Sequence, residues 1–470
     1  MTAPETAQAA AEHYDVAVIG AGPAGTAAAL RAAELGASVV VLEAGRVGGT
    51  CVNTGCVPTR VLAKTARLIR ETRSAADYGI VVGSPSLDWP AVVARVGERV
   101  DAVRSIKREA ERFAESGVTL IHEGRARFVD DRTLVLDSGR LVTADSILIC
   151  VGGHSRRLPI PGAELATVPE EVLTLPEVPR RVAIIGAGNT GAQLVTVFNA
   201  FGAQVTLLDV APRVLMASDG AIAEAVTAAF VSHGVDVRTG IRTVERLERA
   251  GDGSISLTWR EDDSRAADFD VVIMATGWPA DVEDLGLENA GIATVRSAIP
   301  VDQYFRTTVP HIFAVGDANG RDMLVQAAHS EGEAAAENAV LDANRSAPHH
   351  LLPAGGFTDP DYAGVGLTVE QARERDEFCV VATVRYADLE RAVIDDRETG
   401  FLMLIADRRR ELILGAHAVG ENAVEVIQSV TTSMAAGIDV ATLARVRFAY
   451  PTYSAVIGAA ARALLTEREA

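Results

Sequence analysis

The chain contains one structural unit twice, and this repeat limits the folds open to it. Residues 16–44 read VAVIGAGPAGTAAALRAAELGASVVVLEA, and residues 182–210 read VAIIGAGNTGAQLVTVFNAFGAQVTLLDV. Each copy has a β-branched run, a G-x-G-x-x-G turn, an Ala-rich helical stretch and a second apolar strand. An acidic residue then follows the last glycine by eighteen positions in both copies. The pattern predicts two strand–turn–helix–strand units, each opening a parallel sheet.

Each part of this pattern has a physical reason in a dinucleotide site. The first glycine allows a tight turn, the second lets the backbone approach a pyrophosphate, and the third lets helix pack on strand. The helix N-terminus faces the anion, and the acid accepts a hydrogen bond from an adenosine ribose hydroxyl. The two copies supply Gly20, Gly22, Gly25 and Glu43, and Gly186, Gly188, Gly191 and Asp209. A lone motif of this kind is often only a turn, but two complete units predict that the chain binds two dinucleotides.

Two of the four cysteines stand close together, in the segment GGTCVNTGCVPTR at 48–60. Cys51 and Cys56 are five positions apart, whereas Cys150 and Cys379 are single and widely separated, so a four-cysteine zinc site is not expected. Two small buried core residues are the plainer interpretation. A redox pair is favoured, because one thiolate can attack a substrate while its neighbour resolves the mixed disulfide.

The segment GGTCVNTGC, with a dinucleotide motif on either side, resembles the class I pyridine nucleotide–disulfide oxidoreductases. Dihydrolipoamide dehydrogenase, glutathione reductase and mercuric reductase belong to this family. The resemblance runs nearly the whole length of the chain. It includes ATG at 275–277, TTVPHIFAVGDANG at 307–320, GFTDPDYAGVGLT at 356–368, LGAHAVGENAVEVIQ at 414–428 and AYPTYSA at 449–455.

The resemblance implies a set of cofactor and redox roles. The first motif is expected to bind FAD and the second NAD(P)H, with Gly49, Thr50, Asp317 and Gly277 completing the cofactor sites and Asp317 holding the ribityl chain. Cys56 corresponds to the thiol under the flavin that forms the charge-transfer contact. Cys51 corresponds to the interchange thiol that meets the substrate. No metal-ligand residues are assigned.

The family's architecture also implies the fold class and the domain order. We expect an α/β protein with two Rossmann-like dinucleotide-binding domains and a C-terminal α+β dimerisation domain. The expected FAD-binding domain is discontinuous (1–155 and 278–347), the NAD-binding domain covers 156–277, and the dimerisation domain covers 348–470. A long helix with a polar face is expected around 88–116. In the family, the last turn of the dimerisation domain reaches into the partner's active site.

The chain departs from the family where the disulfide reductases carry a C-terminal acid–base pair. Their His and Glu are replaced by Tyr450 and Ala455, around a retained Pro451. A phenol with a pKa near 10 does not serve as a base at neutral pH as imidazole does. Efficient reduction of lipoamide or glutathione disulfide is therefore not expected. By resemblance the Tyr450–Pro451 bond should be cis, with the phenol directed at the partner's Cys51.

By resemblance, two further substitutions lie near the flavin and a third lies at the nicotinamide pocket. The family's Lys after the second cysteine is Arg60, its partner Glu is Gln193, and the Tyr over the nicotinamide pocket is Asn189. Drift with retained polarity is the simpler explanation of the first two. Alternatively, a guanidinium that no carboxylate neutralises stabilises reduced, anionic flavin. Asn189 should leave the pocket more open to small or planar acceptors.

Nicotinamide choice is predicted from charge at the second motif. Asp209 stands where a carboxylate binds a ribose diol and repels a 2′-phosphate, so NADH is expected over NADPH. Arg213, four residues later, offers some compensation for a phosphate.

Composition limits the partners and the compartment. A net charge of −19 argues against nucleic acid or an anionic membrane surface as a partner. No stretch of eighteen uncharged apolar residues occurs, so no membrane span is expected. The N-terminal MTAPETAQAAAEHYD lacks the basic and apolar regions of a signal peptide. Four cysteines, two of them in a redox motif, favour the reducing cytoplasm over a disulfide-stapled secreted fold.

The sequence therefore predicts a homodimeric oxidoreductase that passes electrons from NADH through FAD and the Cys51–Cys56 disulfide to a small acceptor. A metal ion, a quinone or an atypical disulfide all remain open as that acceptor. In a second hypothesis the disulfide is a bystander and the protein is a diaphorase or quinone reductase. In a third the chain is a non-catalytic dinucleotide-binding protein that senses redox state.

Overall fold

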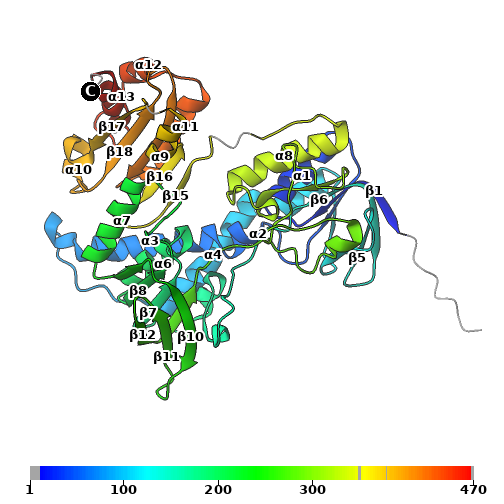
Figure 1. Ribbon diagram of the computed structural model, residues 1–470, viewed down its shortest axis with the longest axis horizontal. Coiled ribbons are helices and arrows are strands. Elements are labelled where there is room, and N and C mark those ends of the chain that lie inside the picture. Colours follow the sequence, from blue (N-terminus) through cyan, green and yellow to red (C-terminus); the bar gives the residue numbers. More distant parts are fainter. Residues whose placement is uncertain (1–10, 348–350, 377, 467–470) are drawn as a thin grey trace, which may run out of the picture. The chain divides into compact units, whose positions relative to one another are not determined.

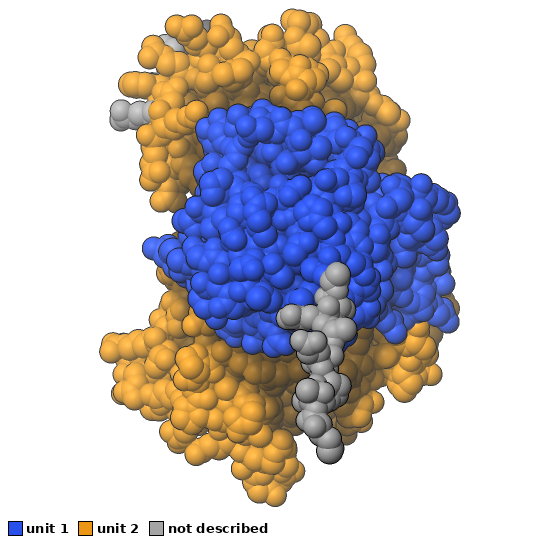
Figure 2. Space-filling view, turned by 90° about the vertical axis from the view of Figure 1, so that its right-hand side faces the viewer, with its two compact units in different colours: residues 1–58, 95–155, 278–349 blue, residues 59–94, 156–277, 350–470 orange. Residues whose placement is uncertain are grey.

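The computed structural model describes residues 11–347, 351–376 and 378–466. The N-terminal segment 1–10 and the expected start of the dimerisation domain at 348 lie outside these residues. The chain divides into two compact units (Figure 2). Unit 1 contains residues 1–58, 95–155 and 278–349, and unit 2 contains residues 59–94, 156–277 and 350–470. Each unit is therefore assembled from segments far apart in the sequence.

Unit 1 is built on a seven-stranded mixed sheet of order β3-β2-β1-β6-β5-β4, with β14 pairing β6. Strands β3, β2, β1, β6 and β14 are parallel, whereas β4, β5 and β6 pair antiparallel. The strands are β1 (Glu12–Ile19), β2 (Val39–Leu42), β3 (Thr119–Ile121), β4 (Ala126–Phe128), β5 (Thr133–Leu136), β6 (Leu141–Ile149) and β14 (Ile312–Ala314).

Both faces of this sheet are buried, which explains the continuous apolar runs of its central strands. Alternate residues such as Val16 and Val18 pack under helices α1 (Pro23–Glu34) and α8 (Val325–Leu341), which contact each other (Figure 1). The intervening residues, Ala17 and Ile19, join a second core on the opposite face. Parallel strands buried on both faces characteristically read as unbroken Val, Ile and Leu.

The segment expected as one helix over 88–116 is two helices. Helix α4 (Trp89–Lys107) ends before Arg108, which adopts a left-handed backbone conformation with φ 49° and ψ 38°. Helix α5 (Glu109–Glu115) follows directly. Side-chain periodicity continues across the break, so the sequence pattern alone did not reveal it. Helix α2 (Gly49–Asn53) also belongs to unit 1, and α3 (Cys56–Arg73) and α4 contribute residues to both units.

Unit 2 contains a second parallel sheet of four strands in the order β13-β7-β8-β9. This is the strand order of a nucleotide-binding half. Its strands are β7 (Arg181–Ile185), β8 (Gln204–Asp209), β9 (Asp236–Thr239) and β13 (Val271–Met274). Helices α6 (Asn189–Ala200) and α7 (Gly220–Ser232) cover one face. The antiparallel meander β10 (Thr243–Arg249), β11 (Ile255–Arg260) and β12 (Ser264–Phe269) covers the other.

The C-terminal part of unit 2 is a five-stranded antiparallel sheet of order β15-β16-β19-β18-β17, packed against helices. The strands are β15 (Ala354–Gly356), β16 (Tyr362–Gly366), β17 (Val380–Arg385), β18 (Phe401–Ala406) and β19 (Ile413–Val419). The helices are α9 (Val369–Arg375), α10 (Glu390–Ile394), α11 (Ala423–Ala435), α12 (Val440–Arg445) and α13 (Ala455–Thr466). The predicted fold class, two Rossmann-like sheets followed by an α+β domain, is confirmed.

In the part of the chain that the structure describes, no helix has the length and apolar character needed to cross a membrane.

Candidate active site

The two glycine turns have the same geometry. Gly20 and Gly186 adopt φ values of +100° and +108°, which residues with a Cβ rarely do. A Cβ built on Gly25 would lie 1.9 Å from the carbonyl oxygen of Gly20, and one on Gly191 would lie 1.8 Å from that of Gly186. Helix and strand therefore pack too closely for a side chain at either position.

The acidic residue that ends each unit closes its turn by hydrogen bonds. Glu43 accepts from the backbone N–H of Ala21 at 2.6 Å and from the N–H two positions after itself at 2.7 Å. Asp209 accepts from the backbone N–H of Ala187 at 2.5 Å and from that of Ala211, two positions after itself, at 2.7 Å. Both carboxylates are thus fixed beside the glycine turn, where dinucleotide folds recognise a ribose diol.

The N-termini of α1 and α6 offer donors and space for an anion. Gly22 and Gly188 precede these helices in extended backbone, and neither end has a side-chain cap. Among the described residues, a Cβ on Gly188 would have no neighbour within 4 Å. The nearest to one on Gly22 is the Cα of Gly49, at 3.7 Å. Uncapped N–H groups at a helix start bind phosphate, so both turns fit a dinucleotide pyrophosphate.

The segment that carries the cysteines packs on the first of these turns. Gly49 and Thr50 begin α2, and a Cβ on Gly49 would lie 2.8 Å from the Cα of Gly22. The carbonyl oxygen of Thr50 accepts hydrogen bonds from the two residues that precede Cys56. The redox segment and the first dinucleotide turn are therefore joined by backbone contacts within unit 1.

The two cysteines lie at the junction of two helices. Cys51 is in α2, and Cys56 is the first residue of α3. Both are free thiols and hydrogen-bond to each other. This bond lowers the pKa of Cys56 to about 7, and together with burial it raises the pKa of Cys51. The N-terminal N–H groups of α3 also favour a thiolate at Cys56. The pair is therefore polarised, with the Cys51 thiol donating to a Cys56 thiolate.

Asp317 is held in a loop that depends on a buried acid. It lies in the short helix η5 (Gly316–Asn319), and its Oδ2 accepts from the indole N–H of Trp278 at 2.8 Å. Burial raises the pKa of the Asp317 carboxyl. Glu331 of α8, fully buried, accepts from the backbone N–H of the first residue of η5 at 2.7 Å and from the side-chain amide of the last at 2.8 Å. Glu331 thereby positions the loop that presents Asp317.

Arg60 contacts an aromatic ring in unit 2. Its guanidinium lies 3.5 Å from the centre of the Phe357 ring. The backbone N–H of Phe357 donates to Gln193 at 3.4 Å, so the residue at the family's Glu position meets the aromatic neighbour of Arg60. Asp361 is also close: burial raises the pKa of its carboxyl to about 7, and the positive charge of Arg60 opposes this rise. A carboxyl group therefore lies near Arg60 that the sequence interpretation did not include.

The side chain of Asn189, at the start of α6, is hydrogen-bonded to a tyrosine. Its Oδ1 accepts from the hydroxyl of Tyr362 at 2.7 Å, and the Tyr362 ring is buried. Gly277, the last residue of the ATG segment, has a φ of +127° and accepts from the backbone N–H of Arg156 at 3.1 Å. Both contacts lie within unit 2.

The side chain of Arg213 donates hydrogen bonds within its own loop. Its Nη2 donates to the carbonyl oxygens of Met216 at 3.2 Å and Ser218 at 3.1 Å. These bonds hold the segment between β8 and α7. Nη2 of the guanidinium is therefore engaged by the loop, whereas its buried Nε has no hydrogen-bond partner among the described residues.

The C-terminal substitutions lie at the start of the last helix. Ala455 is the first residue of α13, and Tyr450 is 77% exposed in the single chain. The Tyr450–Pro451 bond is cis, as predicted. The approach of Tyr450 to the partner's Cys51 stays a prediction.

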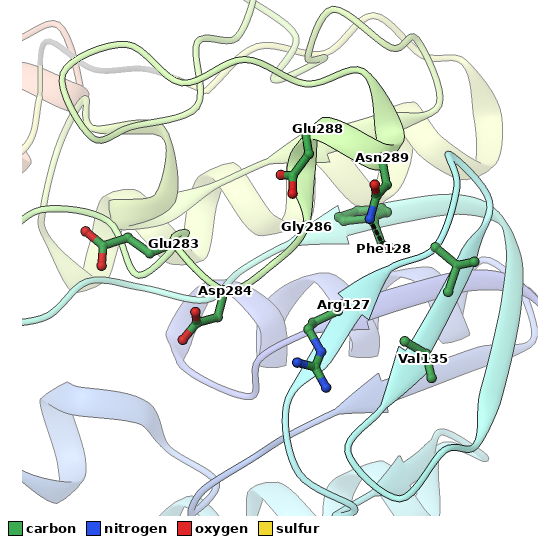
Figure 3. A pocket seen from close by; sticks show the side chains of 9 residues that line it. Arg127, Phe128, Val135, Glu283, Asp284, Gly286, Glu288 and Asn289 are labelled. Carbon is green, nitrogen blue, oxygen red and sulfur yellow. Dashed lines mark hydrogen bonds between the residues drawn. The ribbon is translucent and has the colours of Figure 1, made fainter.

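A cavity of about 460 Å³ in unit 1 lies between the β4–β5 hairpin and the segment 283–289 (Figure 3). The carboxylates of Glu283, Asp284 and Glu288 and the guanidinium of Arg127 line it, and the Asn289 side chain donates to the carbonyl oxygen of Phe128 at 2.8 Å. Its lining includes none of the predicted cysteine, glycine or cofactor residues, so it is separate from the redox pair.

Sequence reasoning missed Trp278 and Glu331, and also Lys107 and Glu109, whose charges act on the cysteine thiols. Glu331 had a sequence signal, because it is an acidic residue in the Ala-rich stretch AAHSEGEAAAENAV, where burial demands a partner. Lys107 also had one, since Lys64 and Lys107 are the only lysines among 44 lysine and arginine residues. Trp278 and Glu109 gave none.

The comparisons with known proteins agree with this geometry. Residues 14–332 match the family model described as "Pyridine nucleotide-disulphide oxidoreductase", and residues 352–461 match that family's dimerisation domain. The chain belongs to this family. Its members are NAD(P)H-dependent flavoprotein oxidoreductases that use FAD and a redox-active disulfide, and the dimerisation domain indicates a homodimer.

Several curated relatives align over nearly the whole chain. A glutathione reductase of Nostoc is 34% identical over 90% of this chain and 94% of its own length. A dihydrolipoyl dehydrogenase of Mycobacterium tuberculosis is 33% identical over 94% of this chain and 96% of its own length. A mercuric reductase of Bacillus cereus is 32% identical over 93% of this chain and 69% of its own length.

Among solved structures, the HOCl-induced flavoprotein disulfide reductase RclA of Escherichia coli superposes with a TM-score of 0.84 at 26% identity. The match covers 96% of this chain and 99% of RclA.

Proposed function

We propose that this oxidoreductase passes electrons from NADH through FAD and the Cys51–Cys56 disulfide to a small acceptor. The observation that carries the proposal is the polarised thiol pair. Cys51 donates to Cys56, whose pKa is lowered to about 7, so the pair divides into a resting thiolate and a thiol that becomes the attacking group. Such a division suits a dithiol that first accepts electrons and then delivers them.

The two glycine turns supply the cofactor sites in this proposal. FAD, when bound, supplies hydride acceptance and electron delivery. Gly20, Gly22, Gly25 and Glu43 hold its adenosine diphosphate half, with Gly49, Thr50 and Asp317 on the flavin side, and Gly186, Gly188, Gly191, Asp209 and Gly277 hold the nicotinamide nucleotide. The corresponding domains are 1–155 with 278–347 for FAD, 156–277 for NADH and 348–470 for dimerisation.

NADH is proposed over NADPH because of the charges at the end of β8. Asp209 presents a fixed carboxylate to the adenosine ribose, and Arg213 donates to carbonyl oxygens of its own loop. A 2′-phosphate would meet the negative charge of Asp209 directly, whereas the Arg213 side chain is tied to its own loop through Nη2.

The acceptor is proposed to be a metal ion, a quinone or an atypical disulfide rather than lipoamide or glutathione disulfide. Tyr450 and Ala455 stand where the family's disulfide reductases carry their acid–base pair. The likeness to mercuric reductase and to RclA, which has also been solved as a Cu(II) complex, supports a metal ion within this group. A small number of cysteines, two of them in a redox motif, supports a cytoplasmic location.

Anaerobic titration with NADH tests the proposal. We expect each subunit to take up four electrons, the free-thiol count to rise by two, and a long-wavelength band to appear that Cys56→Ser abolishes while FAD stays bound. Uptake of two electrons with an unchanged thiol count would make the disulfide a bystander and the protein a diaphorase. Absence of reduction would support a non-catalytic redox-sensing role.

A further inference from the structure

Unit 1 places an ion pair against the helix that carries Cys51. Lys107 Nζ lies 3.4 Å from Glu109 Oε1. Residues two apart on one helix point to different sides and do not meet. Here they meet because Arg108, between them, adopts the left-handed conformation that separates α4 from α5. The break between α4 and α5 therefore brings Lys107 and Glu109 close enough to form an ion pair.

Two contacts position this pair beside α2. Arg104, one turn before Lys107 and on the same face of α4, donates to Asn53 at the end of α2 at 2.5 Å. On the other side, a Cβ built on Gly48, the residue before α2, would lie 3.2 Å from Glu109 Oε2. Arg104 on α4 thus contacts one end of the helix that contains Cys51, and Glu109 of the pair lies close to the other end.

The pair is electrostatically coupled to both sulfurs. After the larger effects of the mutual hydrogen bond and of burial, the charge of Lys107 lowers the pKa of Cys51 and of Cys56, whereas that of Glu109 raises the pKa of Cys51. Asp317 raises the pKa of Cys56. Arg104 is the other charged group of this face that contacts α2. Lys107 is therefore a cation whose charge reaches both sulfurs.

The carboxylate of Glu109 is buried, which is energetically unfavourable for a charged group. Its side chain is 6% exposed, and within the described residues Oε2 has no hydrogen-bond partner. A buried carboxylate oxygen without a donor is unfavourable unless a charge compensates it. Lys107 provides that charge, and in turn the buried carboxylate keeps the otherwise flexible ammonium next to α2.

We propose that Lys107, positioned by Glu109, stabilises the thiolate forms of Cys51 and Cys56. The inference deepens the proposed function and rests on it. When the Cys51 thiolate attacks an acceptor disulfide, a bond forms between the two sulfurs and the acceptor's bond breaks. Attack by Cys56 then releases the second thiolate, and both products take protons from water.

The test measures thiol reactivity rather than turnover, so it needs no known acceptor. The FAD-bound protein is reduced with a phosphine, and the rates of iodoacetamide alkylation of Cys51 and Cys56 are followed from pH 5.5 to 9.5 by peptide mapping. Because the two thiols are coupled, the profile reports apparent pKa values of the pair.

Lys107→Met is expected to move the profile to higher pH by about one unit, which is about a tenfold loss of reactivity below the pKa. Lys107→Arg keeps the charge and should stay within about threefold of wild type. Lys107→Met combined with Glu109→Gln should recover part of the loss, because it removes the uncompensated carboxylate beside the thiol. A purely structural role would not reverse in this way.

Arg108→Gly is the matched control. It removes a neighbouring positive charge that is paired with Glu115 at the surface, and glycine keeps the left-handed backbone. Its profile should overlay that of wild type. The proposal is overturned if Lys107→Met leaves the profile unchanged, or if Arg108→Gly shifts it as far. Since phosphine forms the thiols whether or not NADH does, failure of the NADH titration would refute the proposed function separately.

Discussion

At the residue scale, the protein distinguishes chemically similar side chains by their surroundings. Cys51 and Cys56 are five residues apart, yet their pKa values move in opposite directions because one thiol donates to the other. The thiol of Cys150, which is fully buried, has a raised pKa and no such neighbour. Reactivity therefore follows from the α2–α3 junction rather than from the cysteine itself.

The nicotinamide preference depends on a single carboxylate and is tested at this scale. Asp209→Ser should lower kcat/KM for NADH and raise it for NADPH, each by about tenfold, because the ribose hydrogen bond and the repulsion of a 2′-phosphate both disappear. The measurement is steady-state oxidation of both nucleotides with an artificial acceptor.

Arg213→Ala is the companion variant. Because Arg213 donates to carbonyl oxygens of its own loop, its removal should change the ratio of the two kcat/KM values by less than about twofold. A wild-type enzyme that prefers NADPH, or a large shift with Arg213→Ala, would show that a cation and not Asp209 governs this pocket.

At the scale of the elements, α3 is joined to the C-terminal sheet by partly buried ion pairs. Arg67 pairs with Glu421 at 2.8 Å, and Arg70 pairs with Asp359 at 2.7 Å. Asp361 lies in the same cluster, and burial raises its pKa to about 7 despite the nearby arginines. The helix that begins at Cys56 is thus anchored, four turns later, to the loops before β16 and after β19.

This anchor predicts a pH dependence of stability. The folded pKa of Asp361 is about 7, above the value of about 4 expected for an unfolded chain, so the folded state binds the extra proton between these values. The contribution is fully present below pH 4 and is lost as the pH rises through 7. Asp361→Asn removes the penalty of the buried charge.

We therefore expect Asp361→Asn to match wild type near pH 4 and to gain stability relative to it as the pH rises to 8, by at most about 4 kcal/mol for a shift of about three pKa units. Thermal unfolding of both proteins at the two pH values measures this difference. Equal shifts at both pH values, or a loss at pH 8 only, would show that the Asp361 carboxylate is ionised and held by the arginines.

At the scale of the whole molecule, the replacement of the acid–base pair by Tyr450 and Ala455 should affect catalysis in the homodimer. The family's C-terminal residues act across the subunit interface, and here Tyr450 is largely exposed in the single chain, next to a cis proline. A phenol does not act as a base at neutral pH, so the homodimer should handle dithiol substrates poorly.

Wild-type enzyme should reduce glutathione disulfide and lipoamide at less than about ten turnovers per second, and Tyr450→His with Ala455→Glu should raise the rate by about tenfold or more. Tyr450→His alone serves as the control, because without the glutamate the imidazole lacks an orienting partner. Rates typical of enzymes for the wild type would contradict this account.

The sequence by itself determined the two dinucleotide units, the redox motif and the order of the fold. These are local properties, since a glycine turn, a β-branched strand and an acid at fixed spacing form one contiguous segment. The cysteine motif is likewise contained within 48–60. The backbone conformation of such a segment is set by its own residues, so it can be predicted from the sequence.

Only the tertiary structure decided which distant side chains act on these segments. Glu331 supports the loop of Asp317 from another helix, Trp278 donates to that carboxylate, and Asp361 lies near Arg60 after a separation of about 300 residues. The break at Arg108 was equally hidden, because the apolar pattern runs on through it. Burial and close approach, which set the charges and the pKa values around the thiols, arise from packing between segments, and the order of residues gives at most an indirect sign of them, such as the acid in the Ala-rich stretch around Glu331.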